Sequence, residues 1–355
     1  MIKDTYNIIG LMSGSSLDGL DIAFCEFTLA DSEWKCMIKS AETVEYSDYW
    51  EDRLKNAHTL NAEALAILNV DFGLLLGEEV WRFISRHSVV PEFVASHGHT
   101  VFHKPEHKLS LQIGSGQHLA TECGLTTIAD FRTKDVVLGG QGAPLVPIGD
   151  KLLYRKFERC LNLGGIANVS FDDADGNRKA YDICPANYAL NYVARQAGKS
   201  YDDAGQMAAS GKIDNDLLSK LDSLEYYALP YPKSIANEWI RNTVLPIIDE
   251  AESSIEDKLH TLCYHMGKQI GKAIGDNPMD KVLITGGGAY NRFLLLQIAM
   301  SSQAAVLVAD PTTVNFKEAM VFAFLGMLRM RNEVNSLASV TGASKDSCGG
   351  VVYNP

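Results

Sequence analysis

One pattern, a strand followed by a glycine-containing loop and a second strand, occurs twice in the chain and constrains its fold more than any other feature. Residues 8–27 read IIGLMSGSSLDGLDIAFCEF, in which two apolar runs flank a core of serine, glycine and aspartate. Residues 158–176, ERCLNLGGIANVSFDDADG, repeat the plan with Gly164 and Gly165 in the loop. Because each copy opens a segment of comparable length, we predict two lobes built on the same plan.

Strands and helices alternate irregularly along the chain. Apolar runs bounded by Gly, Asp or Pro predict strands at 6–12, 20–27, 92–96, 109–113, 126–130, 159–163, 166–171, 180–184, 281–285 and 304–309. A helix over 258–275 is predicted because its apolar residues recur at helical spacing on one face: Leu259, Leu262, Cys263, Met266, Ile270 and Ile274. Another helix should follow Pro185 and end at Gly198. The predicted class is therefore α/β.

The boundary between the two lobes is expected where the composition changes. Residues 130–147 are rich in Gly and Pro, as linking segments often are. We therefore predict an N-terminal lobe over 1–130 and a C-terminal lobe over 131–355.

Charge and composition exclude several classes of protein. The formal net charge of −12 argues against sequence-independent binding to nucleic acid or to an anionic membrane. The N-terminus shows no signal peptide, and the apolar run at 319–328 is too short to span a bilayer. The seven cysteines include no CxxC pair, which favours free thiols in a reducing compartment, and we expect a cytoplasmic protein.

The first loop has the composition of a phosphate-binding loop, although two common nucleotide signatures, GxxxxGK[ST] and GxGxxG, do not occur. A plain hairpin turn would account for Gly19, but not for three serines and a carboxylate together. Hydroxyls and backbone N–H groups of residues 13–16 can hold phosphates, because glycine lets the backbone approach closely. Asp18 could hold Mg²⁺ through water, since Mg²⁺ keeps much of its hydration.

A second glycine-rich stretch, KVLITGGGAYNRFLLLQIAM at 281–300, predicts a strand, three glycines and a helix. A tight turn needs one glycine, whereas Gly286, Gly287 and Gly288 together favour a ligand packed on the backbone. The unpaired N–H groups at the following helix N-terminus would favour a phosphate.

Four histidines gather in SHGHTVFHKPEH, which leaves two interpretations open. A zinc site is one, although Glu106 is the only carboxylate in the stretch and no cysteine accompanies it. Histidines that line a site and hydrogen-bond a ligand are the interpretation we favour: His97, His99, His103 and His107. Serine hydrolase chemistry is not supported, because GxSxG does not occur.

Three acids are candidates for base catalysis. Asp182, at the end of a predicted strand, is rigidly placed for this work, and Asp130 is the second candidate. Glu318 begins an otherwise apolar helix, so it could instead compensate the helix dipole. Arg132 could clamp a carboxylate with its planar fork or form a salt bridge with a neighbouring acid.

Taken together, stretches along almost the whole chain resemble the anhydro-N-acetylmuramic acid kinase family. The opening motif and GGQGAPLVP are the most specific of them. The matching stretches are GLMSGSSLDGLD (10–21), SHGHTVFHKP (96–105), LQIGSGQHLA (111–120), IADFRTKDVVLGGQGAPLVP (128–147), LNLGGIANVSF (161–171), YDICPANYALN (181–191), YDDAGQMAASGKI (201–213), PKSIANEW (232–239), TGGGAYN (285–291), FKEAMVFAFLG (316–326) and SVTGA (339–343).

The resemblance implies a fold and a reaction. The fold is that of the actin, hexokinase and heat-shock chaperone ATPases, a ribonuclease H-like fold in which two α/β lobes hold ATP in the cleft between them. The implied reaction opens a 1,6-anhydro sugar from peptidoglycan turnover with water and phosphorylates the released O6 from ATP, with Mg²⁺. The implied partners are this sugar and ATP, with no nucleic acid and no membrane, and a homodimer is possible.

The resemblance also assigns residues. Asp182 matches the catalytic base, and Asp18 matches the Mg²⁺ partner. The expected nucleotide-binding residues are Ser13, Gly14, Ser15, Ser16, Leu17, Asp18, Gly19, Leu20, Asp21, Gly164, Gly165, Gly286, Gly287, Gly288 and Asn291. The expected sugar-binding residues are His97, Asp130, Arg132, Gln141 and Glu318.

Three departures from the family pattern leave alternatives open. Ser15 replaces the usual Thr, His99 replaces the usual Gln, and Asp-Thr-Gly-Pro-Gly-Asn reads Asp182-Ile183-Cys184-Pro185-Ala186-Asn187. The last change keeps the base but loses both glycines beside it. A related sugar kinase of altered specificity, or an actin-like regulatory ATPase without sugar chemistry, would also fit this pattern.

Overall fold

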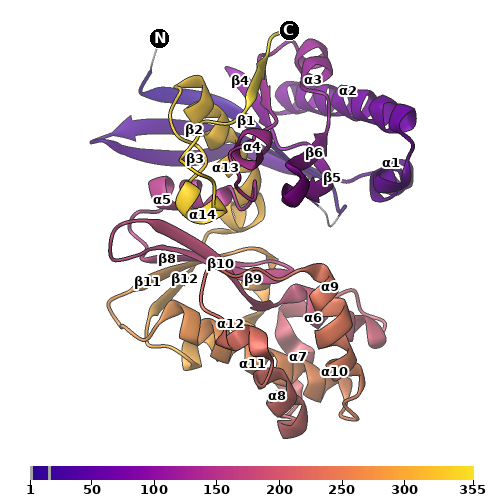
Figure 1. Ribbon diagram of the computed structural model, residues 1–355, viewed down its shortest axis with the longest axis vertical. Coiled ribbons are helices and arrows are strands. Elements are labelled where there is room, and N and C mark those ends of the chain that lie inside the picture. The colour runs from indigo at the N-terminus through magenta and orange to yellow at the C-terminus, as the bar shows by residue number, and fades with distance from the viewer. Residues whose placement is uncertain (1–2, 15–16) are drawn as a thin grey trace. The chain divides into compact units, whose positions relative to one another are not determined.

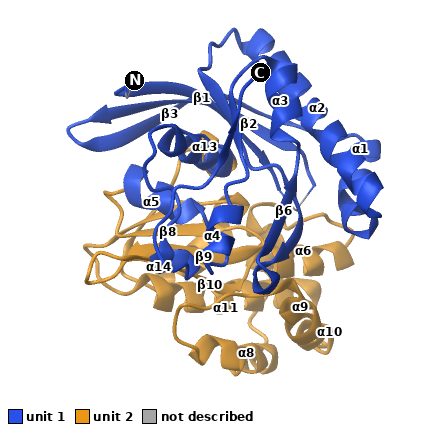
Figure 2. Ribbon diagram, turned by 45° about the horizontal axis from the view of Figure 1, so that its top comes forward, with its two compact units in different colours: residues 1–153, 316–355 blue, residues 154–315 orange. Residues whose placement is uncertain are grey.

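The computed structural model describes residues 3–14 and 17–355. The chain divides into two compact units (Figure 2): unit 1 comprises 1–153 and 316–355, and unit 2 comprises 154–315. The α/β class is confirmed, whereas the predicted boundary at residue 130 does not coincide with the division of the chain. The physical reason is that α5 (Val146–Leu153) packs closely in unit 1: a Cβ on Gly149 would lie 2.7 Å from Val321.

Unit 1 is built on a six-stranded sheet in the order β13-β7-β4-β1-β2-β3. Strands β1, β2 and β3 pair antiparallel, and β4 and β7 continue the sheet parallel to β1. The strands are β1 (Thr5–Ser13), β2 (Leu20–Ala30), β3 (Glu33–Val44), β4 (Phe93–Ser96), β7 (Thr127–Ala129) and β13 (Val351–Tyr353). A separate hairpin joins β5 (His99–Lys104) to β6 (Leu109–Ile113).

Unit 2 repeats this arrangement with a five-stranded sheet in the order β10-β9-β8-β11-β12. Its first three strands again pair antiparallel, and its last two join parallel to the first. The strands are β8 (Arg159–Leu163), β9 (Ile166–Asp172), β10 (Arg178–Pro185), β11 (Lys281–Thr285) and β12 (Ala305–Val308). The predicted duplication is therefore confirmed at the level of strand order and direction.

The helices belong to the units as follows (Figure 1). Unit 1 holds α1 (Asp48–Lys55), α2 (Ala62–His87), α3 (Gly116–Cys123), α4 (Thr133–Val137), α5, most of α13 (Pro311–Met330) and α14 (Ala338–Thr341). Unit 2 holds α6 (Asn187–Gln196), α7 (Gln206–Ser210), α8 (Asn215–Asp222), α9 (Asn237–Trp239), α10 (Leu245–Asp249), α11 (Ile255–Ile274) and α12 (Arg292–Met300).

Strand β1 is apolar because helices cover both of its faces. Ile9 and Leu11 are buried in a core that includes Phe72 of α2. On the other side α13 lies so close that a Cβ on Gly10 would be 1.9 Å from the carbonyl oxygen of Ala319. A strand buried on both faces reads as a continuous apolar run, and the sequence of β1 has this form.

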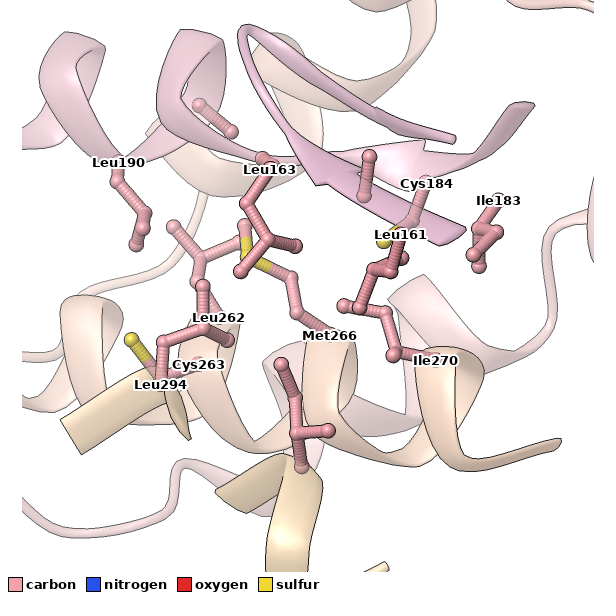
Figure 3. Close-up of a cluster of buried hydrophobic side chains, with 14 of the residues drawn as sticks. Leu161, Leu163, Ile183, Cys184, Leu190, Leu262, Cys263, Met266, Ile270 and Leu294 are labelled. Atoms are coloured by element: carbon pink, nitrogen blue, oxygen red, sulfur yellow. The ribbon is translucent and has the colours of Figure 1, made fainter. Parts of the chain in front are cut away.

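The core of unit 2 forms between its sheet and α11 (Figure 3). The predicted apolar face of this helix is confirmed, since all six of its residues are buried. The Ser254 hydroxyl accepts from Asp257 N at the start of the helix, and Gly275 ends it at φ 78°.

Every strand predicted from sequence is confirmed, with each end within three residues of the prediction. Strands β3, β5 and β13 were not predicted. Within residues 3–14 and 17–355, no helix combines the length and the apolarity needed to cross a membrane.

Candidate active site

The hairpin between β1 and β2 carries the predicted phosphate loop of unit 1. Ser13 pairs with Leu20 at its base, while Ser15 and Ser16 lie outside the described residues. Leu17 has φ 62°, and a Cβ on Gly19, at φ 153°, would lie 2.6 Å from the carbonyl oxygen of Val44. The backbone near residue 19 therefore has no room for a side chain.

Ser13 is buried, and its hydroxyl is engaged inside unit 1. The Tyr46 hydroxyl donates to Ser13 Oγ at 2.8 Å, and Ser13 Oγ lies 3.1 Å from His99 Nδ1. A serine hydroxyl has one donor and two acceptor sites, so Ser13 Oγ can bond Tyr46 and His99 at the same time. This chain of three side chains fixes the residue at which the loop begins.

Two carboxylates follow on the same hairpin. Asp18 is exposed, and Asp21 accepts a hydrogen bond from Thr43 Oγ1 at 2.6 Å. Burial, with smaller contributions from the charges of Asp18 and Glu318, raises the pKa of Asp21 to about 6. Leu20, also predicted in this loop, has its side chain in the core, so only its backbone could meet a ligand.

His97 and Arg132, two predicted sugar-binding residues, contact each other directly. Arg132 Nε and Nη2 lie 3.2 and 2.9 Å from His97 Nε2, while His97 Nδ1 lies 2.9 Å from the carbonyl oxygen of Gly98. Because a guanidinium only donates, Nε2 must accept and the imidazole is neutral with its proton on Nδ1. Burial, then the charge of Arg132, hold the pKa of His97 well below its usual range.

Asp135, whose role was not predicted from the sequence, organises the glycine-rich loop that carries Gln141. Its buried carboxylate accepts from Gly142 N at 2.8 Å and from the hydroxyls of Ser336 and Thr341 at 2.7 and 2.8 Å. Arg132 Nη1 in turn donates to the carbonyl oxygen of Gly142 at 2.6 Å. An acid placed just before GGQGAP was the available signal, but its partners lie about 200 residues further along the chain.

Asp130 and Glu318 complete the set predicted for the sugar. Asp130 has φ 58°, and its carboxylate accepts from Thr133 N at 3.3 Å. Glu318 lies inside α13, which begins at Pro311, so the prediction that it begins a helix is wrong and dipole compensation does not explain it. Partial loss of hydration raises the pKa of Glu318, and the positive charges of Arg132 and Lys317 oppose this shift.

The histidine stretch gives no support to a zinc site. In the described parts of the chain, no three His, Cys, Asp or Glu side chains are grouped so that they could hold one metal ion. His99 faces Ser13, His97 faces Arg132, and His103 Nδ1 lies 3.1 Å from Ser110 Oγ. These histidines are therefore distributed over separate hydrogen bonds.

In unit 2, the hairpin between β8 and β9 holds the start of α6. Backbone N–H groups of Asn187 and Tyr188 donate to the carbonyl oxygens of Gly164 and Gly165 at 3.1 Å each. A Cβ on Gly165, which is exposed, would meet no atom closer than Tyr188 Cβ at 3.9 Å. Internal packing therefore does not require a glycine at residue 165.

The three glycines after β11 differ in whether the packing around them leaves room for a side chain. Gly286, at φ 82°, and Gly288 pack against the backbone of Leu163, where a Cβ would lie within 2.9 Å of its carbonyl oxygen. Gly287 is exposed, and a Cβ there would lie 3.8 Å from the nearest atom, Asn187 Nδ2. Like Gly165, Gly287 is a glycine that the fold itself does not explain.

Helix α12 does not begin at these glycines. It begins at Arg292, and the Asn291 carboxamide oxygen accepts from Leu294 N at 2.9 Å. The predicted order of strand, glycines and helix is confirmed, and a short 3₁₀ turn (Gly287–Tyr290) that includes two of the glycines precedes the helix. Asn291, predicted at the nucleotide, uses its side-chain oxygen as a helix cap.

Asp182, the predicted base, lies within β10 beside a bulge rather than at the strand's end. Its Oδ2 accepts from Ile235 N at 2.9 Å, and no hydrogen bond from the described residues reaches Oδ1. Burial raises the pKa of Asp182, and the hydrogen bond from Ile235 N opposes this shift. A carboxylate whose pKa is raised is a stronger base while it remains ionised at neutral pH.

The segment that departs from the family pattern turns its side chains into the core. Ile183, Cys184 and Ala186 are 3%, 0% and 0% exposed, and the first two lie among the core side chains of Figure 3. The replacements therefore change the packing beneath Asp182 rather than the exposed surface beside it.

The family model described as anhydro-N-acetylmuramic acid kinase matches residues 6–355. The anhydro-N-acetylmuramic acid kinase of Francisella tularensis subsp. novicida is 33% identical over 362 residues, which cover 94% of this chain and 95% of that protein. The protein of the same name from Aliivibrio fischeri is 33% identical over 374 residues, which cover 97% and 98%.

Solved structures resemble the chain more weakly. Component A of the (R)-2-hydroxyglutaryl-CoA dehydratase of Acidaminococcus fermentans aligns with a TM-score of 0.47 and 11% identity, over 90% of this chain and 96% of that one. A likeness of this size supports no conclusion about function.

Two units with one strand order, each opening with a glycine-containing hairpin, make this a protein of the α/β class. Within that class, the chain belongs to the anhydro-N-acetylmuramic acid kinase family. The family and the sugar-kinase class predicted from sequence are confirmed.

Unit 1 should lose stability in mild acid through His99. Burial lowers the pKa of His99 from 6.5 to about 4, so between these values the unfolded chain binds a proton that the folded chain does not. The stabilisation is thus complete above pH 6.5 and declines as the pH falls toward 4. Between pH 7 and pH 5 the expected loss is about 2 kcal/mol.

Urea unfolding at both pH values tests this expectation by comparing the wild type with His99→Gln, whose carboxamide does not titrate. The variant should lose about 2 kcal/mol less than the wild type on going to pH 5. His107→Gln, at an exposed residue nearby, is the control and should behave as the wild type does. Equal pH dependence of the wild type and His99→Gln would contradict the assignment.

Proposed function

We propose that this protein is an ATP-dependent kinase that opens 1,6-anhydro-N-acetylmuramic acid with water and phosphorylates O6, giving N-acetylmuramic acid 6-phosphate for peptidoglycan recycling. The observation that carries the proposal is Asp182, a carboxylate with a raised pKa and one oxygen without a hydrogen bond from the described residues, in a chain that matches the family over residues 6–355. The place of action is proposed to be the cytoplasm, and a homodimer remains a prediction.

Asp182 is proposed to act as the general base. It accepts a proton from water, whose oxygen then bonds to C1 of the sugar while the bond from C1 to O6 breaks. The released O6 attacks the γ-phosphorus, the bond to the β–γ bridging oxygen breaks, and ADP leaves. A positioned base of this kind contributes about 10²–10⁴-fold to a rate.

The nucleotide is proposed to contact the loop of residues 13–21 and the glycines at 164–165 and 286–288. Gly165 and Gly287 support this proposal, because the protein's own packing leaves both positions open. Mg²⁺ commonly uses one or two carboxylates together with phosphates and water. The exposed Asp18 fits that donor set, and the ion would neutralise phosphate charge.

The sugar is proposed to contact His97, Asp130, Arg132, Gln141 and Glu318. The direct contact of Arg132 with His97, and its bond to the loop that carries Gln141, support a shared role for these side chains. The buried side chains of Ile183, Cys184 and Ala186 favour the family's own substrate over a related sugar, since they do not line an exposed surface.

Asp182→Asn should abolish formation of the 6-phosphate while ATP binding stays near the wild-type value. The amide cannot accept the proton from water, whereas the proposed nucleotide contacts lie at other residues. Product is measured by mass spectrometry and ATP affinity by calorimetry. Retained turnover would remove Asp182 as the base.

The same assay on the wild type tests the function itself. Lack of product with the anhydro sugar, alongside an active relative, would reject the substrate. Product only from sugars without the anhydro bridge would favour a kinase of altered specificity. Slow ATP hydrolysis that no sugar stimulates would favour a regulatory ATPase.

Gly287→Ala should weaken ATP binding at unchanged stability, whereas Gly288→Ala should destabilise the fold. A methyl at residue 287 would project into open space, and its expected effect is about a tenfold lower affinity. A methyl at residue 288 would meet Leu163 Cβ at 2.7 Å, so the free energy of unfolding should fall by about 1–3 kcal/mol. Calorimetry and urea unfolding measure the two effects, and wild-type ATP affinity in Gly287→Ala would remove this contact.

A further inference from the structure

One short segment, residues 226–235, holds Asp182 by three of its polar groups. The Asp182 backbone N–H donates to the carbonyl oxygen of Lys233 at 3.1 Å, and its own carbonyl oxygen accepts from the Tyr226 hydroxyl at 2.6 Å. The third contact is the hydrogen bond from Ile235 N to Oδ2. Strand β9 pairs with β10 here, but a bulge shifts the register between Asp182 and Cys184. The segment therefore supplies constraints that the strand ladder does not.

Lys233 links the two ends of this segment by contacting Tyr226. Its Nζ donates to the carbonyl oxygen of Tyr226 at 3.1 Å and lies 4.6 Å from the centroid of the Tyr226 ring. Lys233 forms no ion pair with a carboxylate among residues 3–14 and 17–355. The Lys233 side chain is half-buried, and loss of hydration lowers its pKa. A cation over an aromatic ring contributes about 0.5–2 kcal/mol.

We propose that Tyr226 and Lys233 are positioning residues for Asp182. Together they hold the segment so that Ile235 N–H binds Oδ2 and leaves Oδ1 as the oxygen that accepts the proton from water. This inference rests on the proposed role of Asp182 as the base. Beyond that role, Oδ1 is identified as the oxygen that reacts, and Tyr226 and Lys233, which lie outside β10, as the residues that orient the carboxylate.

Among the groups near Asp182, the hydrogen bond from Ile235 N is the one whose loss would change the pKa of this carboxyl. Tyr226, Cys184 and Lys233 are titratable neighbours on the strand and the segment, which also carry Tyr181, Tyr227 and Tyr231. Burial raises the pKa values of Tyr226 and Cys184, so both remain neutral near pH 7. Loss of the Ile235 hydrogen bond would remove a contact that favours the ionised carboxylate, and the pKa of Asp182 would rise.

Lys233→Met and Tyr226→Phe test the proposal in the full-length enzyme. The first removes the contact that closes the segment, and the second removes the hydroxyl that binds the Asp182 carbonyl oxygen. We expect kcat to fall about tenfold, since a misplaced catalytic group loses up to about 10²-fold, with KM for ATP unchanged. The acidic limb of the kcat profile should move to higher pH, and Lys233→Arg should retain the wild-type profile.

Carbon-13 NMR of the Asp182 carboxyl, assigned with Asp182→Asn, measures its pKa without substrate. Matched controls are Lys220→Met and Tyr192→Phe, which break exposed contacts to Glu250 and Asp249 in the same unit. A raised pKa in both test variants and in neither control supports the proposal. An unchanged pKa, or activity lost only in proportion to thermal stability, overturns it.

Failure of the proposed function has a different signature. If the wild type forms no 6-phosphate, or Asp182→Asn remains active, the reaction or the base is wrong. The carboxyl titration still reports whether Tyr226 and Lys233 orient Asp182, because that measurement needs no turnover.

Discussion

The close approach of β1 and α13 is the contact on which unit 1 depends. Gly10 lies where any Cβ would meet the carbonyl oxygen of Ala319, and Gly326 lies where a Cβ would be 2.6 Å from Ala95 Cβ. Gly10 thus lets the backbones of β1 and α13 pack directly, and Gly326 lets the same helix approach β4, at separations that larger side chains forbid. This contact returns residues 316–355 to the unit that begins the chain, and it places Glu318 within electrostatic reach of Arg132 and Asp21.

The two units share a strand order but use their first hairpins differently. In unit 1 the hairpin is polar, and Ser13 at its base is held by Tyr46 and His99. In unit 2 the carbonyl oxygens of Gly164 and Gly165 receive the first N–H groups of α6, so those donors are already used. A phosphate at this hairpin would therefore have to bind the loop backbone and not the N-terminus of α6. For this reason the open space at Gly165 and Gly287 is a better indication of a phosphate site than the helix dipole.

Local patterns predicted the parts of this structure that local forces determine. Apolar runs gave the central strands, and the spacing of Leu259, Met266 and Ile270 gave the buried face of α11. The return of residues 316–355 to unit 1 was not predictable, since it depends on backbone packing between elements more than 300 residues apart. Among site residues, Asp182 and Arg132 stood out by type and motif. Tyr46, Asp135 and Tyr226 did not, because each acts through hydrogen bonds to partners distant in the sequence, a relation that periodicity does not encode.

The replacement of two glycines beside Asp182 changes how the backbone that carries this residue is held in place. Ile183, Cys184 and Ala186 place apolar atoms in the core that also contains Leu161, Leu163 and Met266 (Figure 3). Buried side chains at these positions restrict the backbone more than glycine does, because glycine has the largest conformational freedom to lose on folding. Asp182, the proposed base, is therefore held from the core by these three residues and from the strand's other edge by residues 226–235. With both constraints in place, the carboxylate can be aimed by its neighbours although its own strand is irregular at the bulge.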